Sequence, residues 1–157
     1  MDVREPLRNS EQTGRRMYQL VRDYAGDLRG AFIRQGNKVR PLSSLSLPEM
    51  HDLVRKLPYK RDDEPVEVVG RPARILKLPA LDCKKKGVLL GAWFTLHGYS
   101  PLRQWRFVAS SRRPDGKIHH VFPQVKRAGT WRNVDATYES DRLFAPKTVT
   151  AMEVLEP

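Results

Sequence analysis

Cysteine is nearly absent from this sequence. The 157 residues include one cysteine, Cys83, and four histidines scattered along the chain. A single cysteine excludes a disulfide within the chain and is typical of proteins from a reducing compartment. Neither the cysteine nor the histidines show the spacing of metal ligands, so we expect no metal and no other cofactor.

Long apolar runs are absent as well. No stretch of this sequence approaches the roughly 20 apolar residues that a membrane-spanning helix needs, so we expect no membrane span. Residues 1–10 lack the apolar core of a signal peptide. The sequence has no internal repeat and no low-complexity tract. Its length predicts a single domain over residues 1–157.

Acidic residues are few relative to basic ones. Lysine and arginine total 29 against 18 aspartates and glutamates, so the formal net charge is +11. Such a balance attracts nucleic acid, anionic membranes and acidic proteins. No nucleic-acid motif accompanies it, and the aromatic residues are not interleaved with the basic clusters along the sequence. The charge alone therefore predicts only nonspecific nucleic-acid contact.

The cysteine stands at the head of an apolar segment that has helical periodicity. The apolar positions are Val88, Leu89, Ala92, Trp93 and Leu96. Gly98 ends the run, and Asp82 has the side chain of an N-cap. This pattern predicts a helix from about Cys83 to His97.

Cys83 then lies in the first turn of that helix. Unpaired N–H groups and the helix dipole favour thiolate over thiol there. Lys84, Lys85 and Lys86 act in the same direction, although cations in a first turn oppose the dipole. The alternative interpretation is a small buried hydrophobic residue without chemistry. The cysteine by itself leaves both interpretations open.

A β-hairpin downstream carries a histidine and an aspartate. We expect a four-residue loop over 126–129, with Val125 opposite Thr130. In that register His120 faces Asp135 on the same side of the hairpin, within hydrogen-bonding reach. The register selects His120 over His119, whereas a slip of one residue would reverse the choice. An ordinary surface pair on a hairpin remains the alternative.

Cys83, His120 and Asp135 follow one another in the order of a nucleophile, a base and an orienting group. The backbone N–H of Cys83 is the expected first oxyanion donor. Asn133 faces the same side in this register and is a reserve candidate for the orienting role. Pro123 cannot donate to a strand ladder and suggests an edge strand or a bulge.

Together these motifs resemble the transglutaminase-like superfamily. The family pattern is an acidic residue and Cys at a helix start, then His-x-aromatic on a strand, then Trp-x-x-x-Asp-x-Thr on the next. The matching segments are Asp82-Cys83, His120-Val121-Phe122 and Trp131-Arg132-Asn133-Val134-Asp135-Ala136-Thr137, within residues 66–140. The resemblance implies a papain-like fold, in which a cysteine-bearing helix packs on an antiparallel sheet.

The resemblance also implies a function. Cys83 would be the nucleophile, His120 the base and Asp135 the orienting group in acyl transfer or hydrolysis on protein amide groups. The chain is most similar to small transglutaminase-like proteins of tailed bacteriophages, although Lys84 and Lys85 replace two acids of their motif. This likeness implies a protein substrate or phage structural proteins as partners, in the cytoplasm of a bacterial host or in the virion. A structural or assembly protein without turnover is the alternative.

The chain before the motifs predicts helices. Residues 11–33 carry an apolar stripe, with Ser10 as the cap and 35–37 as the end. The stripe consists of Met17, Leu20, Val21, Tyr24, Leu28 and Phe32. Ser46 and Glu49 form a capping box for a helix to about Lys56, on which His51 is a surface or packing residue.

The loop over 58–65 divides an N-terminal helical lobe, residues 1–60, from a transglutaminase-like catalytic core, residues 61–157. We expect extended segments around 66–68 and 75–76, a strand over 105–110 and a turn over 113–116. Residues 141–157 are expected to pack back as irregular chain or a short helix. The predicted architecture is therefore α+β, with helices against an antiparallel sheet of at least three strands.

Overall fold

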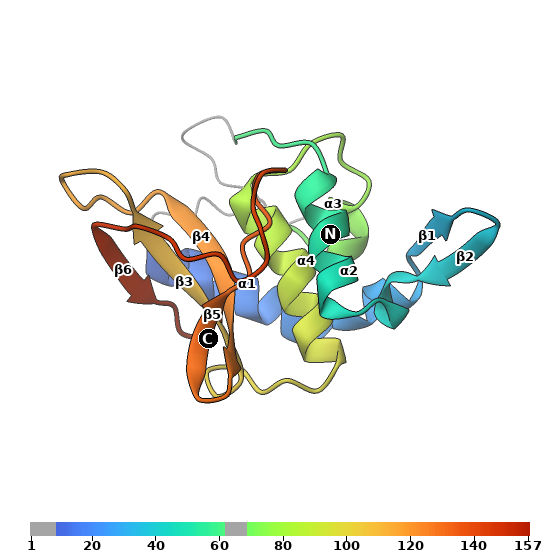
Figure 1. Cartoon of the computed structure of the whole chain (residues 1–157). Coiled ribbons are helices and arrows are strands. Elements are labelled where there is room, and N and C mark those ends of the chain that lie inside the picture. The colour runs from blue at the N-terminus through green and yellow to red at the C-terminus, as the bar shows by residue number, and fades with distance from the viewer. Residues whose placement is uncertain (1–8, 62–68) are drawn as a thin grey trace.

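The structure is a computed structural model that describes residues 9–61 and 69–157, and its fold is α+β as predicted (Figure 1). The helices are α1 (Ser10–Tyr24), α2 (Leu47–Lys56), α3 (Pro72–Ile75) and α4 (Cys83–Leu96), with 3-10 segments η1 (Ala25–Arg29) and η2 (Leu42–Ser44). The strands are β1 (Phe32–Gln35), β2 (Lys38–Pro41), β3 (Trp105–Ser111), β4 (His120–Arg127), β5 (Thr130–Asn133) and β6 (Ala151–Val154). One antiparallel sheet has the order β5-β4-β3-β6, and β1 pairs with β2 in a separate hairpin.

Helix α4 lies at the centre of the fold. It contacts α1, α2 and α3 as well as β3 and β4, so neighbours surround it on all sides (Figure 1). Its apolar residues are buried almost throughout, which is why the segment is apolar around its whole circumference and not along one stripe. The predicted start is confirmed, because the side chain of Asp82 accepts a hydrogen bond from the Lys85 backbone N at 2.9 Å.

Two glycines let α1 and β3 approach α4 closely. A Cβ atom on Gly91 would lie 2.7 Å from Phe107 Cζ and 3.1 Å from Val21 Cγ1. One turn earlier, a Cβ on Gly87 would lie 3.1 Å from Met17 Cε. The absence of a side chain on this face therefore sets how tightly the helix packs against the sheet.

Helix α1 is tied to the sheet by a buried tyrosine. The Tyr18 hydroxyl accepts a hydrogen bond from the Phe107 backbone N at 2.8 Å and donates one to the Leu155 carbonyl at 2.9 Å. Burial, the largest cause, raises the pKa of Tyr18 to about 12, so the hydroxyl keeps its proton. The N-terminal helix and the sheet thus share one hydrophobic core.

The predicted helix over 11–33 is too long. Asn9 and not Ser10 is the N-cap of α1, and the α-helix ends at Tyr24. The following glycines at 26 and 30 disfavour continuation of the helix. The chain then enters the β1–β2 hairpin, whose turn contains Gly36 at a φ of +61°. Phe32 consequently leaves the predicted stripe and is 62% exposed.

Helix α2 is confirmed, and the capping box of Ser46 and Glu49 is present in full. Strand β3 and the turn over 113–116 are confirmed as well, the turn by a Gly116 N to Arg113 O hydrogen bond of 2.9 Å. Residues 75–76 are not extended, because Pro72 begins the short helix α3 there. The expected extended segment at 66–68 and most of the charged loop lie outside the described residues.

The C-terminal segment adds a strand where irregular chain or a short helix was expected. Strand β6 pairs antiparallel with β3, and the Thr150 N donates to the Ser111 carbonyl at 2.8 Å just before it. The pairing covers the edge of β3 that β4 leaves open, which satisfies backbone groups that would otherwise face solvent. Within residues 9–61 and 69–157, no helix is long and apolar enough to cross a membrane.

The close approach at Gly91 leads to a stability prediction. We expect Gly91→Ala to lower the free energy of unfolding by about 1–3 kcal/mol, because overpacking outweighs the gain in helix propensity. Gly26→Ala is the matched control, since its Cβ would lie 3.7 Å from the tip of the Arg29 side chain. Urea unfolding of both variants measures the difference. A Gly91→Ala protein as stable as the control would contradict the packing argument.

Candidate functional site

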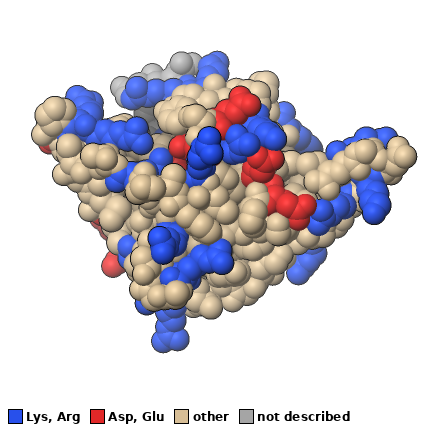
Figure 2. Space-filling view, in the orientation of Figure 1, with Lys and Arg blue, Asp and Glu red and all other residues tan. Residues whose placement is uncertain are grey.

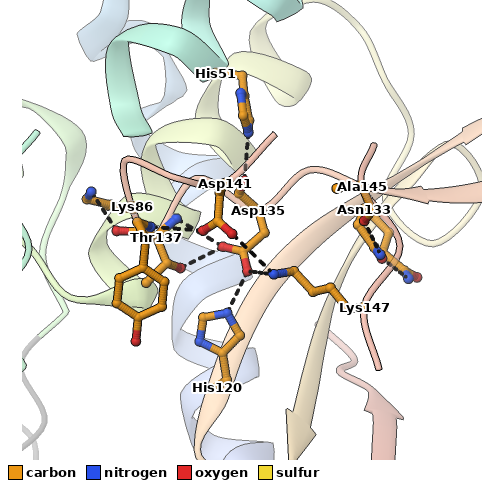
Figure 3. A network of polar contacts seen from close by, with 11 residues as sticks. His51, Lys86, His120, Asn133, Asp135, Thr137, Asp141, Ala145 and Lys147 are labelled. Carbon is orange, nitrogen blue, oxygen red and sulfur yellow. Dashed lines mark hydrogen bonds and ion pairs between the residues drawn. The ribbon is translucent and has the colours of Figure 1, made fainter. Parts of the chain in front are cut away.

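The structure brings His120 and Asp135 into direct contact (Figure 3). His120 is the first residue of β4, and its Nε2 lies 2.6 Å from Asp135 Oδ2. Cys83 also acts on the pKa of this imidazole, which indicates that its thiol is near the ring. His119 is exposed, and its Nδ1 lies 3.3 Å from the Lys117 carbonyl. The structure therefore pairs His120, and not its neighbour, with Asp135.

The predicted hairpin register is wrong by two residues. Arg127 pairs with Thr130, and the turn contains only Ala128 and Gly129. Both turn residues have positive φ angles, 48° and 77°, which is the geometry of a tight two-residue hairpin. A slip of two residues keeps every side chain on its predicted face, so the side of His120 was predicted correctly although its partner position was not.

Asp135 lies just beyond β5, which ends at Asn133. The chain continues alongside β4, and the Val134 backbone N donates to the Pro123 carbonyl at 2.8 Å. Pro123 sits inside a central strand, contrary to the expected edge or bulge. Its missing N–H would point to the same side as its carbonyl, toward Val134, so the pairing of Pro123 with Phe107 of β3 loses no hydrogen bond.

Cys83 begins α4 and is 6% exposed. Of the three lysines that follow it, Lys84 and Lys85 share one partner and Lys86 binds elsewhere. Lys84 Nζ lies 3.2 Å and Lys85 Nζ 3.8 Å from the carboxylate oxygens of Asp82. Lys86 is buried, and burial lowers its pKa. Its ammonium donates to the backbone carbonyls of Leu57 at 2.7 Å and Thr137 at 2.8 Å (Figure 3).

Both oxygens of the Asp135 carboxylate are fully engaged. Oδ1 accepts hydrogen bonds from the Thr137 backbone N at 3.0 Å and from Thr137 Oγ1 at 2.6 Å. Oδ2 contacts His120 and lies 2.7 Å from Lys147 Nζ. Burial acts to raise the pKa of Asp135, but hydrogen bonds and the charges of His120 and Lys147 outweigh it and lower this pKa strongly. Asp135 is therefore a carboxylate across the physiological pH range.

The same contacts determine the protonation state of His120. Burial acts to lower its pKa, but hydrogen bonds to Asp135 and Cys83 and their negative charge raise the pKa to about 9. His120 is thus an imidazolium at neutral pH.

Lys147 is a site residue that the sequence does not reveal. Its side chain is 9% exposed and also lies 3.4 Å from Asp141 Oδ1 (Figure 3). It belongs to the segment between β5 and β6, where no periodicity or motif marks it. Lys147 and His120 share one carboxylate oxygen, so two cations face each other across Oδ2.

Two further polar residues near Asp135 have structural partners. His51 Nε2 lies 2.6 Å from the Asp135 backbone carbonyl, and burial lowers the pKa of His51, so a neutral ring donates this hydrogen bond. His51 is therefore a buried packing residue. Asn133 accepts from Gln124 Nε2 at 2.9 Å and donates to the Ala145 carbonyl at 3.0 Å. The reserve orienting role of Asn133 is not supported, because Asp135 holds His120.

Comparisons with protein-family models, with curated proteins and with solved structures find no match to this chain. Among the described residues, no group of histidine, cysteine, aspartate and glutamate has the arrangement of a metal site. The arrangement of Cys83, His120, Asp135 and Lys147 must therefore be interpreted from its own geometry and charge.

The shared oxygen Oδ2 leads to a prediction about His120. Lys147→Met removes a positive charge close to the imidazolium, so we expect the pKa of His120 to rise further, by about one unit. Lys147→Arg retains the charge and should change this pKa much less. NMR titration of the four histidines measures it in both variants. A fall of the His120 pKa in Lys147→Met would show that the lysine orients Asp135 more than it opposes the imidazolium.

The raised pKa of His120 predicts a pH dependence of stability. The folded protein binds this proton more tightly than the unfolded chain, whose histidines titrate near 6.5. The stabilisation is fully present below about pH 6.5 and is lost as the pH rises through about 9. The loss is on the order of 3 kcal/mol at most. Urea unfolding of wild type and His120→Gln between these pH values measures it, and the variant should lack this decline.

Proposed function

We propose that this chain is a transglutaminase-like cysteine enzyme that performs acyl transfer or hydrolysis on protein amide groups. In this proposal Cys83 is the nucleophile, His120 the acid and base, and Asp135 the orienting group. The observation that carries it is the pairing of His120 with Asp135 at 2.6 Å, close to Cys83 at the start of α4. A papain-like fold, with the cysteine-bearing helix against an antiparallel sheet, belongs to the same proposal.

The mechanism follows from the charges. The Cys83 thiolate attacks the carbonyl carbon of the amide, and a C–S bond forms as the carbonyl becomes an oxyanion. In this proposal the Cys83 backbone N–H, at the start of α4, stabilises this oxyanion. The His120 imidazolium then gives its proton to the leaving nitrogen, and the C–N bond breaks.

The thioester is resolved in a second step. Neutral His120 takes a proton from the incoming water or amine, whose oxygen or nitrogen attacks the acyl carbon. The C–S bond breaks, the thiolate returns, and the imidazolium is regenerated. Water as the acceptor makes the protein a peptidase or amidase, whereas an amine makes it a transglutaminase. Asp135 remains a carboxylate throughout and fixes the ring through Nε2.

The second candidate is a phage virion or assembly protein that uses this fold without turnover. The observation that favours it is a basic and aromatic surface at the β4–β5 hairpin. Arg106 lies 4.0 Å and Lys126 5.7 Å from the centre of the Trp131 ring, and Arg127 lies 5.0 Å from that of Phe144. The strands thus interleave cations and aromatic rings that are separate in the sequence.

This surface would suit an acidic protein partner or nonspecific nucleic-acid contact. Basic side chains are spread over the face drawn in Figure 2, whereas the acidic ones are fewer. Under either candidate, the proposed setting is the cytoplasm of a bacterial host or the virion.

The ion pair in the mechanism predicts how the thiol reacts. We expect His120→Gln to slow iodoacetamide alkylation of Cys83 by at least about tenfold at pH 6.5, because the variant lacks the imidazolium that supports the thiolate. At pH 10 free thiols ionise unaided, so the two proteins should react within about twofold. His119→Gln is the matched control, since that residue is exposed outside the site. Equal rates for all three proteins at the lower pH would remove the basis of the mechanism.

Cys83→Ala separates the two candidates. The substitution removes the nucleophile with little change in volume, so the fold should be retained within about 1–2 kcal/mol. If the protein is an enzyme, cleavage of proteins from the same genome, or amine incorporation into them, disappears while binding to those proteins persists. If wild type shows no turnover and no trapping by a thiol-directed acyl probe, while both proteins co-assemble equally, the second candidate is correct.

A further inference from the structure

Two partly exposed tyrosines stand next to Cys83 and His120. Tyr59 is 40% exposed and Tyr138 is 46% exposed. Their ring centres lie 4.8 Å apart with an interplanar angle of 54°. They come from segments far apart in the sequence, yet they form one aromatic surface.

Tyr59 is held beside the start of α4. The Leu81 backbone N donates to the Pro58 carbonyl at 2.8 Å, and the Lys60 N donates to the Leu81 carbonyl at 3.1 Å. These bonds enclose Tyr59 and fix it against the residue that precedes Asp82. The pairing of Tyr59 with Leu81 brings the tyrosine close to the start of α4, where Cys83 lies.

Tyr138 is held beside the histidine. Its ring is nearly parallel to the His120 imidazole, at an interplanar angle of 11° and 6.5 Å between ring centres. Its backbone N donates to Asp141 Oδ2 at 2.9 Å. The two tyrosines therefore connect the start of α4 with the histidine through one continuous aromatic contact.

A buried lysine joins the two segments. The Lys86 ammonium binds the carbonyls of Leu57 and Thr137, which lie close before Tyr59 and Tyr138 in the sequence. Lys86 is in the first turn of α4, as Cys83 is. The tyrosine surface and the thiol are thus fixed by one element, which is the rigid arrangement that a substrate subsite requires.

The surface is neutral and apolar. Burial, the hydrogen bond to Tyr138 and the negative charges of Asp82 and Cys83 raise the pKa of Tyr59 to about 12, so its hydroxyl keeps its proton. Aromatic rings that remain exposed beside a reactive group offer large contact area at low conformational cost. A flat apolar or aromatic group fits this surface.

We propose that Tyr59 and Tyr138 form a subsite that selects acyl groups with an apolar or aromatic side chain next to the carbonyl that Cys83 attacks. The inference rests on the proposed function, because it assumes that Cys83 receives the acyl group. It adds the substrate class, which neither the triad nor the fold specifies.

The single thiol allows a direct test without a known substrate. Wild type is labelled with N-benzylmaleimide and with N-methylmaleimide, and mass spectrometry follows the modification of Cys83. The ratio of the two rates is divided by the same ratio for a free small thiol. We expect wild type to favour the benzyl reagent by about 3- to 10-fold after this correction, because one aromatic contact is gained.

Substitutions locate the preference. Tyr59→Ala and Tyr138→Ala should each reduce the corrected ratio toward one, whereas Tyr59→Phe and Tyr138→Phe should keep most of it. Phe32→Ala is the matched control, since it removes a ring that is 62% exposed on the β1–β2 hairpin. Thermal unfolding of each variant verifies that the fold is retained.

The outcomes are distinct. A corrected ratio of one in wild type, or an unchanged ratio in both alanine variants, overturns the subsite, and the wild-type ratio decides even if an alanine variant fails to fold. If instead the proposed function is wrong, the rate at which N-methylmaleimide labels Cys83 will not depend on His120. The benzyl preference is measured independently of that dependence.

Discussion

The buried carboxylate of Asp135 is the interaction on which the site depends. The residue is 3% exposed, and an ionised group in that position is tolerated only when it is paired and hydrogen-bonded. Its partners come from β4, from the turn at Thr137 and from Lys147 ahead of β6, while α2 contributes His51 to its carbonyl. Compensation of this charge thus holds β4 and the segment of Lys147 at the carboxylate, and the bond to the carbonyl adds α2.

The consequences reach His120 and the thiol. A carboxylate that stays ionised holds the imidazole in its charged form, and the proton is then stored beside Cys83 before any substrate arrives. Lys147 shares the same oxygen and opposes that charge, so the strength of the pair results from two cations in competition. Lys86 anchors the first turn of α4, which contains Cys83, because its ammonium binds the carbonyls of Leu57 and Thr137.

Local signals were enough to predict the elements that carry the motifs. The capping hydrogen bonds of Asp82 and of the box at Ser46 form within one helical turn. These helix starts therefore do not depend on distant parts of the chain. The hairpin register was missed because Ala128 adopts a positive φ, which its residue type does not signal. The β6 pairing was missed because it depends on β3, far away in sequence, and Lys147 because it lies in irregular chain that no periodicity or motif marks. The side of His120 was found because a slip of two residues preserves the face.

Stability alone does not account for this cluster. Buried ion pairs seldom stabilise a fold more than apolar side chains of the same volume would, since desolvation offsets their attraction. Apolar residues make up most of the core around α4. A purely structural module would be served as well by such packing at Asp135 and Lys147. An imidazolium kept beside the only thiol has a use in acyl transfer, and this is why the proposed catalytic role explains the cost of the buried charges better than a scaffold role does.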